Sequence, residues 1–248
     1  MPKSLANVKA ILFDIDQTIW NWRECKKASI EASSFAMSEA GLNLFPRKIR
    51  KRIHQIYREN DYEYEHQKVF DDLLRRLKVN PDDIIYDKIK SAATVAYEET
   101  ERKYLKSYPD VPIALNDLNN MGYKLGVVSD APSLEGWERL RKMDLLKHFQ
   151  EDHIRIGKEP KTSKKPFEII MKQHDYAPNE VVMVGDDPKK DIKPANELGI
   201  VTVLFKFCQT YPIDNNDSFQ HPDYLVVSIW EFIELLKSAK GISKKVYI

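Results

Sequence analysis

The stretch ILFDIDQTIW, residues 11–20, decides the fold that this chain can adopt. An apolar run of β-branched and aromatic residues stops there on two aspartates, Asp14 and Asp16, and Thr18 follows them. Strand interiors disfavour aspartate, so an apolar strand with two carboxylates at its C-terminal end presents charge where open parallel sheets hold their ligands. Two acids at such an edge indicate a bound cation or acid–base chemistry.

Length and charge limit the classes of protein to be considered. At 248 residues the chain is long enough for one large domain or for a core with an inserted second domain. A formal net charge of +1 gives no general attraction to nucleic acid or to an anionic membrane. No stretch approaches the roughly 18 apolar residues of a membrane-spanning helix, and the start MPKSLANVKA lacks the apolar segment of a signal peptide. The sequence predicts a cytoplasmic protein with neither a nucleic-acid nor a membrane partner.

The two cysteines, Cys25 and Cys208, lie far apart in sequence and form no CxxC or Cys/His spacing. Isolated cysteines of this kind argue against a disulfide framework and against a zinc site. We interpret both as unreactive thiols of a reduced protein.

The segment from residue 22 to about residue 107 has the pattern of helices, with no convincing strand. Amphipathic stretches with helical spacing cover residues 28–40, 47–57, 64–77 and 84–104. Between the last two, Asn80 and Pro81 resemble a helix cap and its first turn. The basic run RKIRKRIHQIYR, residues 47–58, is interpreted as a solvated helix face rather than a site for polyanions.

From Tyr108 onward, apolar strands and helices alternate. Strand candidates are residues 124–129, 153–156, 181–185, 201–205 and 224–227, and helices are predicted to begin at Pro112, near Ser133, near Ser163, near Lys189 and at Ser228. This alternation predicts a Rossmann-like parallel sheet with helices on both faces, in which residues 11–13 form the first central strand. We therefore expect an α/β core of residues 1–20 and 108–248, interrupted by an all-helical domain of residues 21–107.

Three later segments place polar side chains at matching strand ends. VVSDAP, residues 127–132, puts Ser129 and Asp130 ahead of a helix whose free N–H groups can hold an anion. VVMVGDDPKKDI, residues 181–192, ends its apolar run on a Gly-Asp-Asp sequence: Gly185, Asp186, Asp187, with Asp191 further on. Between them, the lysine-rich segment GKEPKTSKKPFEII, residues 157–170, is able to bring one ammonium group to the same edge of the sheet.

These segments resemble the motifs of the haloacid dehalogenase superfamily of phosphohydrolases: DxDxT, a strand-end Ser or Thr, a Lys, and a Gly-Asp pair with a further Asp. All four occur in the expected order between residues 8 and 205. GVVSDAPSLEGWERL, residues 126–140, also resembles archaeal members, and FDIDQTIW, residues 13–20, is similar to magnesium-dependent phosphatases of the superfamily. Single motifs of this kind are weak, whereas four in order at strand ends are specific.

The resemblance implies phosphoryl transfer to a carboxylate. Asp14 would attack phosphorus and form an aspartyl-phosphate, and Asp16 would give a proton to the leaving group and then activate water. It also implies Mg²⁺ as cofactor, because a cation must offset the repulsion between carboxylate and phosphate. Its ligands would be Asp14, the backbone carbonyl of Asp16, Asp186 and waters, with Asp187 or Asp191 as a further ligand or outer-shell group.

The same resemblance implies that Ser129 and the N–H of Asp130 hold the phosphoryl group, while Thr18 orders the first loop. Two of the acids also have simpler explanations. Asp191 would favour a helix start through the helix dipole, and Asp130 would suit a capping position.

The lysine of the site is less clearly marked. Superfamily members commonly carry Lys-Pro-x-Pro directly before a helix, and the apparent match at Lys165 lies closer than usual to Gly185. Counting back from that glycine, with Ser163 as the helix N-cap, selects Lys161. Lys165 and then Lys164 remain as alternatives.

The first loop and the helical domain would determine what the site accepts. Gln17 stands where glycine is frequent in the superfamily, and its side chain is expected to face away from the site. Trp20 and Arg23 are the expected pocket residues. Other aromatic residues are interpreted as core of the helical domain: Trp22, Tyr62 and Tyr64.

Together these features predict a magnesium-dependent phosphatase that acts on a small phosphorylated metabolite beneath a helical lid. Sugar phosphates, phosphoglycolate and nucleotides are the substrates that the resemblance implies. A phosphomutase, a phosphonatase or a haloacid dehalogenase of the same superfamily are the alternatives, besides a non-enzymatic binding protein. Asp16 argues against a dehalogenase, which usually lacks the second acid. Whether the protein forms a homodimer is left open.

Overall fold

The computed structural model of this protein describes residues 2–60 and 65–241. The chain divides into two compact units: an α/β unit, built from Met1–Asn21 and Ser107–Ile248, and a helical unit, Trp22–Lys106. The chain leaves and re-enters the α/β unit at neighbouring points. There Trp20 forms an antiparallel bridge with Ser107, and the N–H of Tyr108 donates to the carbonyl of Ile19 at 3.0 Å.

Six strands of the α/β unit form one parallel sheet in the order β3-β2-β1-β4-β5-β6. The strands are β1 (Ala10–Phe13), β2 (Lys124–Ser129), β3 (Ile154–Ile156), β4 (Val181–Gly185), β5 (Val201–Phe205) and β6 (Tyr224–Val226). Every residue of β1, β4 and β5 is buried, which explains why these segments form continuous apolar runs. The predicted α/β class with a central first strand is confirmed, and each strand end lies within one residue of its expected position.

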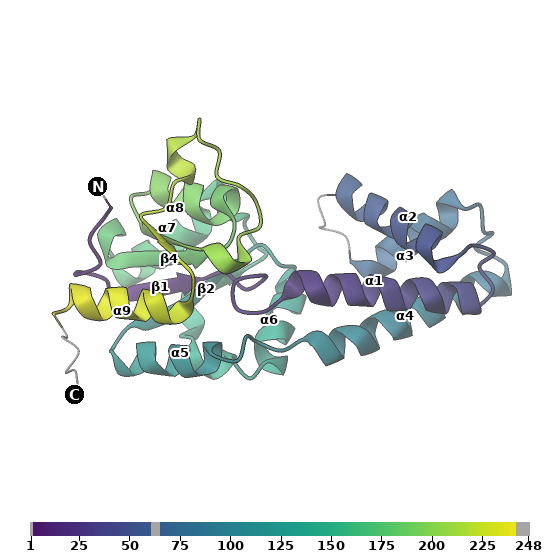
Figure 1. Ribbon diagram of the computed structural model, residues 1–248, viewed down its shortest axis with the longest axis horizontal. Coiled ribbons are helices and arrows are strands. Elements are labelled where there is room, and N and C mark those ends of the chain that lie inside the picture. The colour runs from purple at the N-terminus through teal and green to yellow at the C-terminus, as the bar shows by residue number, and fades with distance from the viewer. Residues whose placement is uncertain (1, 61–64, 242–248) are drawn as a thin grey trace. The chain divides into compact units, whose positions relative to one another are not determined.

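Helices cover both faces of this sheet (Figure 1). They are α5 (Val111–Asn120), α6 (Ser133–Lys142), α7 (Lys165–His174), α8 (Lys193–Glu197) and α9 (Ile229–Ala239). α7 and α8 lie on one face, where Phe167 and Ile170 belong to the same buried cluster as Leu12 and Met183. α5 and α9 pack side by side on the other face. The sheet is therefore the middle layer of three.

Two helices begin later than the sequence predicts. Ser163 is not the N-cap of α7, because Lys161–Ser163 forms a 3₁₀ turn and the Ser163 hydroxyl donates to a backbone carbonyl three residues earlier. Lys164, with φ +66°, then redirects the chain into the helix. Before α8, residues Pro188–Ile192 form a π-helical turn. In both places an irregular turn that positions polar side chains replaces the first turn of the expected helix.

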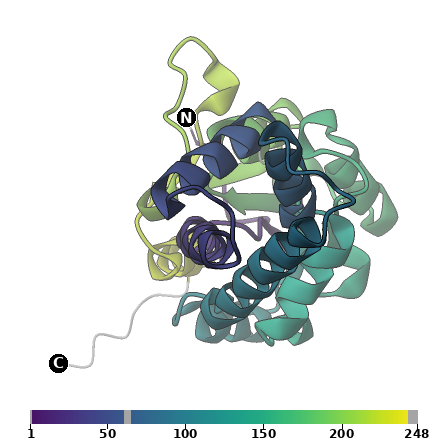
Figure 2. The same cartoon turned by 90° about the vertical axis from the view of Figure 1, so that its right-hand side faces the viewer.

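The helical unit contains α1 (Trp22–Glu39), α2 (Pro46–Glu59), α3 (His66–Arg76) and α4 (Ile84–Tyr104), and no strand among its described residues. The long helices α1 and α4 run side by side (Figures 1 and 2). Each helix contributes buried residues to one core, among them Ile30, Ile53, Phe70 and Ala93. None of the helices in the described parts of the chain has the length and apolarity needed to cross a bilayer.

Two details of the helical unit differ from expectation. α1 begins at Trp22 rather than at residue 28. Asn80 and Pro81 do not start α4, because the Asn80 side chain accepts from the N–H of Asp82 at 3.2 Å and closes a separate turn before the helix. The tyrosines at positions 62 and 64 lie outside the described residues.

Candidate active site

The carboxyl ends of three neighbouring strands bring most of the predicted polar residues together. β1 lies between β2 and β4, and its last residue is level with Val127 on one side and Val184 on the other. The residues that follow therefore emerge at one edge of the sheet. At this edge, carboxylate oxygens of Asp14, Asp186 and Asp191 lie within 4.8 Å of one another, and all three side chains are buried.

Lys161 is the lysine that the fold brings to this cluster. Its ammonium lies 2.7 Å from Asp14 Oδ1 and 2.5 Å from Asp191 Oδ1, in a position where the whole residue is only 4% exposed. Lys164 pairs instead with Glu197 at 2.7 Å, and Lys165 is exposed at the start of α7. Although burial opposes it, the charges of Asp14 and Asp191 raise the pKa of Lys161 well above its usual value, so the ammonium form persists.

Asp191 holds several parts of the site in place. While its Oδ1 accepts from Lys161, its Oδ2 accepts from the backbone N–H groups of Asp186 and Asp187, each at 3.0 Å. Both oxygens of this fully buried carboxylate are thus engaged by the protein itself. A simple role at a helix start does not account for these contacts, since Asp191 lies inside the π-helical turn rather than ahead of it.

Asp187 is not part of the carboxylate cluster. Its Oδ1 accepts from the N–H groups of Lys189 and Lys190, at 2.8 and 3.1 Å, and so caps the π-helical turn. The sequence offers Asp187 as a metal ligand or an outer-shell group, and these contacts show that one of its oxygens supports the loop.

Two threonine hydroxyls contact Asp186. Thr18 Oγ1 lies 3.3 Å from Asp186 Oδ1 and also 3.3 Å from Asp14 Oδ2, so one hydroxyl spans the two acids. Thr210 donates its hydroxyl to Asp186 Oδ2, and its N–H donates to the Asp186 carbonyl at 3.0 Å. The predicted position of Thr18 in the first loop is thereby explained, whereas Thr210 was not anticipated.

The three carboxylates of Asp14, Asp186 and Asp191 are buried close together, with the ammonium of Lys161 beside them. Burial raises the pKa of Asp14 well above its usual value even though Lys161 opposes the change. Burial, and after it the charge of Asp191, raises the pKa of Asp186 to about 7, and burial also raises that of Asp191. A divalent cation would relieve this excess of negative charge, and hard carboxylate oxygens are the donors that Mg²⁺ prefers. The residues present therefore fit the ion that the resemblance implies.

Magnesium is expected to stabilise the protein more at pH 8 than at pH 5. The folded-state pKa of Asp186 is about 7, above its ordinary value of 3.8, so its contribution to the stability of the metal-free protein is lost as pH rises toward 7. The ionised carboxylates that result would attract the cation. Thermal unfolding with and without Mg²⁺ at the two pH values measures the difference, and an equal shift at both would contradict the assignment of Asp186 to the ion.

The absence of a side chain at Gly185 leaves room for the Asp191 carboxylate. Replacing Gly185 by alanine tests whether this space is needed. In Gly185→Ala the new Cβ would lie 2.2 Å from Asp191 Oδ2, so either the strand end or the carboxylate must move. We expect a loss of about 2–3 kcal/mol in the free energy of unfolding, together with weaker Mg²⁺ binding. Urea denaturation and magnesium titration measure both.

Gly122→Ala is the matched control for this substitution. A Cβ at Gly122 meets nothing within 4 Å, and only the backbone φ of +87° opposes it. It should cost about 1–2 kcal/mol and leave Mg²⁺ binding unchanged. The same loss of Mg²⁺ affinity in both variants would show that the contact with Asp191 is unimportant.

Asp16, which the sequence predicts on the side of Asp14, is not one of the three clustered acids, and two other side chains hold its carboxylate. Its Oδ2 accepts from Arg139 Nη1 at 2.5 Å, and its Oδ1 accepts from the indole N–H of Trp20 at 2.8 Å. The alternation of side chains applies only within a strand, and β1 has already ended at Phe13. The next residue, Gln17, has φ +68°, a left-handed conformation that glycine adopts at no steric cost.

Trp20 and Arg23, the expected pocket residues, belong to different units. Trp20 is fully buried in the α/β unit, with the Arg139 guanidinium 5.6 Å from its ring centre. Arg23 is exposed in the helical unit. Arg139, itself buried and paired with Glu135 at 2.7 Å, was missed because nothing in the sequence distinguishes it from other helical arginines.

Ser129 and Asp130 lie at the end of β2, beside the end of β1. The Ser129 hydroxyl is buried and accepts from the N–H of Ala131 at 3.3 Å. The Asp130 carboxylate accepts from the backbone N–H of Lys161 at 2.8 Å, so it fixes the turn that delivers the lysine. It caps another segment of the chain rather than the helix that follows it.

The sequence of this chain is similar to a known family and to curated phosphatases. Residues 11–205 match the family model described as haloacid dehalogenase-like hydrolase. The chain is 32% identical over 234 residues to a glyceraldehyde 3-phosphate phosphatase from Methanopyrus kandleri, an alignment that covers 93% of this chain and 97% of the relative. A relative with the same name from Methanocaldococcus jannaschii is 29% identical, with coverages of 94% and 99%.

A solved structure shares the fold across nearly the whole chain. The HAD phosphatase from Thermococcus onnurineus aligns with a TM-score of 0.64 at 22% identity and covers 92% of this chain and 98% of its own. At this level of identity the likeness shows the fold.

Proposed function

We propose a mechanism and a substrate class for this chain, which belongs to the haloacid dehalogenase-like hydrolase family and is a phosphatase of small phosphate esters. The observation that carries the proposal is the ion pair between Lys161 and Asp14 within a buried cluster of carboxylates. An ammonium beside a carboxylate at a strand end is able to hold a phosphate oxygen while the carboxylate attacks the phosphorus.

Asp14 is the nucleophile in this mechanism. One of its oxygens forms a bond to phosphorus while the bond from phosphorus to the ester oxygen breaks, and Asp16 gives its proton to that leaving oxygen. A water molecule then attacks the aspartyl-phosphate, inorganic phosphate leaves, and the proton of the water passes to Asp16. Both aspartates return to their starting forms.

Proton transfer by Asp16 requires a change in its contacts. Both oxygens of its carboxylate accept hydrogen bonds, from Arg139 and from Trp20. In the proposed cycle Asp16 exchanges at least one of these donors for the leaving oxygen of the substrate, and Arg139 acts as a positioning residue.

Three groups hold the phosphoryl oxygens in this proposal: the Lys161 ammonium, the Ser129 hydroxyl and the backbone N–H of Asp130. The contact of the Asp130 carboxylate with the backbone of Lys161 supports their relative placement. Thr18 supports the first loop through its contacts with Asp14 and Asp186. These groups place positive charge and donors around the equatorial oxygens of the transition state.

Asp14, Asp186 and the backbone carbonyl of Asp16 are the proposed magnesium ligands. When bound, Mg²⁺ would neutralise phosphate charge and so allow a carboxylate to approach. Asp191 acts by holding Lys161 and the loop of Asp186, because its own oxygens are already engaged. Asp187 supports the same loop.

The proposed substrate class is that of small phosphorylated aldehydes and sugars, with glyceraldehyde 3-phosphate as the leading member. Support comes from two archaeal relatives of that name, which align over nearly their whole length. The test is the release of inorganic phosphate from a panel of metabolites with Mg²⁺ and with a chelator. We expect the highest kcat/KM for glyceraldehyde 3-phosphate and no turnover with the chelator.

Other outcomes of the same panel would contradict the proposal. Release of chloride from haloacids without a metal would indicate a dehalogenase, and conversion of a hexose 1-phosphate into its isomer would indicate a mutase. Absence of turnover on every ester would favour a binding protein.

We further propose that the helical unit, Trp22–Lys106, acts as a cap that selects the substrate. The insertion follows directly on the loop of Asp14 and Asp16, and the bridge of Trp20 with Ser107 holds its two ends together. Replacing the unit by a short linker should therefore leave the α/β unit folded and reduce discrimination between glyceraldehyde 3-phosphate and p-nitrophenyl phosphate. Equal discrimination after the replacement would contradict a role in selection.

Location in the cytoplasm and a possible homodimer also remain proposals. The two cysteines, Cys25 and Cys208, are buried and form no disulfide with each other, which suits a reducing compartment. Light scattering measures the assembly state directly.

A further inference from the structure

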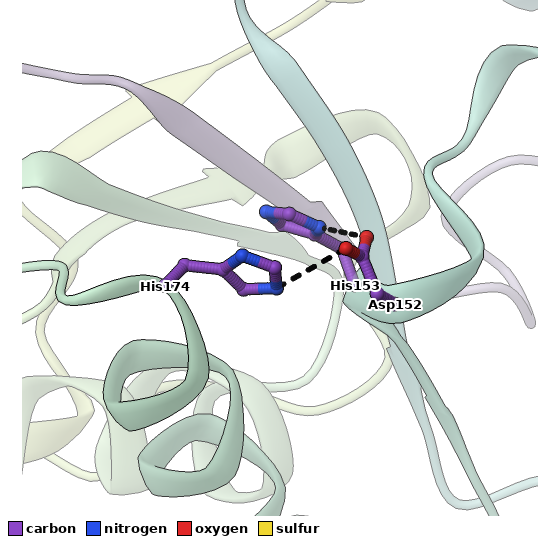
Figure 3. Close-up of side chains that lie close together, drawn as sticks. All are labelled: Asp152, His153 and His174. Atoms are coloured by element: carbon purple, nitrogen blue, oxygen red, sulfur yellow. Dashed lines mark hydrogen bonds and ion pairs between the residues drawn. The ribbon is translucent and has the colours of Figure 1, made fainter.

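A second group of candidate metal ligands lies at the opposite edge of the sheet from the carboxylate cluster. Asp152 and His153 immediately precede β3, and His174 ends α7. They therefore lie beside the amino ends of the strands, whereas Asp14 and Asp186 follow carboxyl ends. One ligand atom from each of the three residues lies within 4.8 Å of the others. Figure 3 shows both imidazoles directed at the Asp152 carboxylate.

The separations suit a small cation between the three side chains. His153 Nδ1 lies 2.7 Å from Asp152 Oδ1, and His174 Nε2 lies 3.7 Å from Asp152 Oδ2. The imidazole rings stack with centroids 3.9 Å apart. Bonds of about 2.0–2.1 Å to zinc put ligand atoms about 3.3 Å apart in a tetrahedral site. The two observed distances, each to a different oxygen of Asp152, bracket that value, and one ligand atom from each residue lies within 4.8 Å of the others, so binding of one ion needs only side-chain rotations.

One nitrogen among these three side chains has no hydrogen-bond partner within the protein. His174 Nε2 is buried and has no hydrogen-bond partner, because 3.7 Å to Asp152 is too long for one. Buried polar atoms without a partner are uncommon in native proteins and call for an explanation. An ion between His174 and Asp152 supplies the missing partner.

The contacts of His153 and the exposure of Asp152 are also those expected at a metal site. His153 Nε2 lies 3.1 Å from the Tyr176 hydroxyl. With a cation on Nδ1, the ring proton resides on Nε2 and is donated to Tyr176, the outer-shell contact typical of metal-bound histidine. His153 is fixed against β2, since a Cβ at Gly126 would lie 2.5 Å from the His153 carbonyl oxygen. The Asp152 side chain is 52% exposed, which leaves room for water ligands.

We propose that Asp152, His153 and His174 bind a first-row transition-metal ion such as Zn²⁺ at a site separate from the carboxylate cluster. Two imidazole nitrogens and one carboxylate suit Zn²⁺, Co²⁺ or Ni²⁺, whereas Mg²⁺ prefers oxygen donors. The lack of CxxC and Cys/His spacing in the sequence does not bear on this site, because its ligands are two histidines and one aspartate. The bound ion joins the end of α7 to the start of β3 and stabilises the α/β unit.

Cobalt and copper ions are the probes for this site, added to metal-free protein with Mg²⁺ in excess. Cu²⁺ bound here should show nitrogen hyperfine coupling in its electron paramagnetic resonance spectrum. The carboxylate cluster offers only oxygens among its three acids, so nitrogen coupling separates the two sites. Asp186→Asn, which removes an acid of that cluster, should leave the nitrogen signal intact. A signal that disappears with Asp186→Asn, or one without nitrogen coupling, would overturn the proposal.

Substitutions of the more accessible ligands test the assignment without disturbing the core. His174→Gln and Asp152→Asn should each weaken Co²⁺ binding by more than about 100-fold, because loss of even an outer-shell partner costs 10- to 100-fold. Tyr176→Phe should weaken it by about 10- to 100-fold. The matched control is His221→Gln, a change at an exposed histidine outside the group, which should bind Co²⁺ like the unmodified protein.

Thermal unfolding provides an independent reading. Zn²⁺ should raise the Tm of the unmodified protein and of His221→Gln, and should leave the Tm of His174→Gln unchanged. Equal Co²⁺ affinity and an equal zinc-induced rise in Tm in His174→Gln and the unmodified protein would show that these residues form only a hydrogen-bonded cluster.

Discussion

Replacing Asp14 by asparagine is expected to lower kcat by about 10⁴-fold or more while the protein stays folded. The amide fills the same volume but cannot form the bond to phosphorus. Asp14 is buried directly after β1, and its oxygens contact Lys161 at 2.7 Å and Thr18 at 3.3 Å. Because burial raises the pKa of this carboxyl, loss of its charge should not reduce stability.

Two measurements check this expectation. Steady-state rates with glyceraldehyde 3-phosphate give the change in kcat, and acid quenching with labelled substrate shows whether a phosphoryl group is trapped on the peptide that contains Asp14. Asp144→Asn is the control, since Asp144 is 80% exposed and asparagine tolerates its φ of +56°. Normal turnover by Asp14→Asn, or a label on another residue, would remove Asp14 as the nucleophile.

Replacing Lys161 by methionine is expected to lower both turnover and the free energy of unfolding. Removing the ammonium leaves three buried carboxylates without their counter-charge, and breaking a buried ion pair in this way costs about 3–5 kcal/mol. The loss should be greatest in metal-free protein at pH 8, and smaller at pH 5, where protonation of the carboxylates relieves their repulsion. Turnover should fall by about 10²- to 10³-fold, as for loss of a group that stabilises transition-state charge.

The neighbouring lysines, Lys164 and Lys165, supply matched controls just after the turn of Lys161. Lys164→Met removes a pair with Glu197 at the surface, and Lys165→Met changes an exposed side chain. Exposed pairs contribute about 0–1 kcal/mol, so both variants should stay close to the unmodified protein. Urea denaturation with a chelator and steady-state kinetics compare the three variants. If Lys165→Met alone lost activity, the assignment of the lysine would pass to that position.

The sheet could be predicted from the sequence because its strands are buried on both faces. Residues of β4 and β5 are all buried and, except for Gly185 and Thr202, apolar, so their ends coincide with the ends of the apolar runs. The same argument located Asp14 and Asp186, which are the first residues after β1 and β4. The hydrophobic pattern alone can therefore predict which residues of a site follow directly on a buried strand.

Contacts formed by irregular turns could not be predicted in the same way. The expectation for Asp16 extended the alternation of a strand past Phe13, where the chain already turns. Lys161 was selected by its distance from Gly185, although the assumed cap at Ser163 does not exist. Thr210 and Arg139 reach the site from other parts of the chain, and their positions depend on tertiary packing that has no local signal.

The contacts of Thr210 with Asp186 have a practical consequence for choosing where the protein can be shortened. The match to the family ends at residue 205, yet a hydroxyl and an N–H that hold Asp186 come from beyond that point. Asp223, further still, accepts from the N–H of Thr202 within β5 at 3.0 Å. A fragment trimmed to residues 11–205 would keep every motif and still lack the contacts that hold the loop of Asp186, so we expect the smallest active fragment to extend past Asp223.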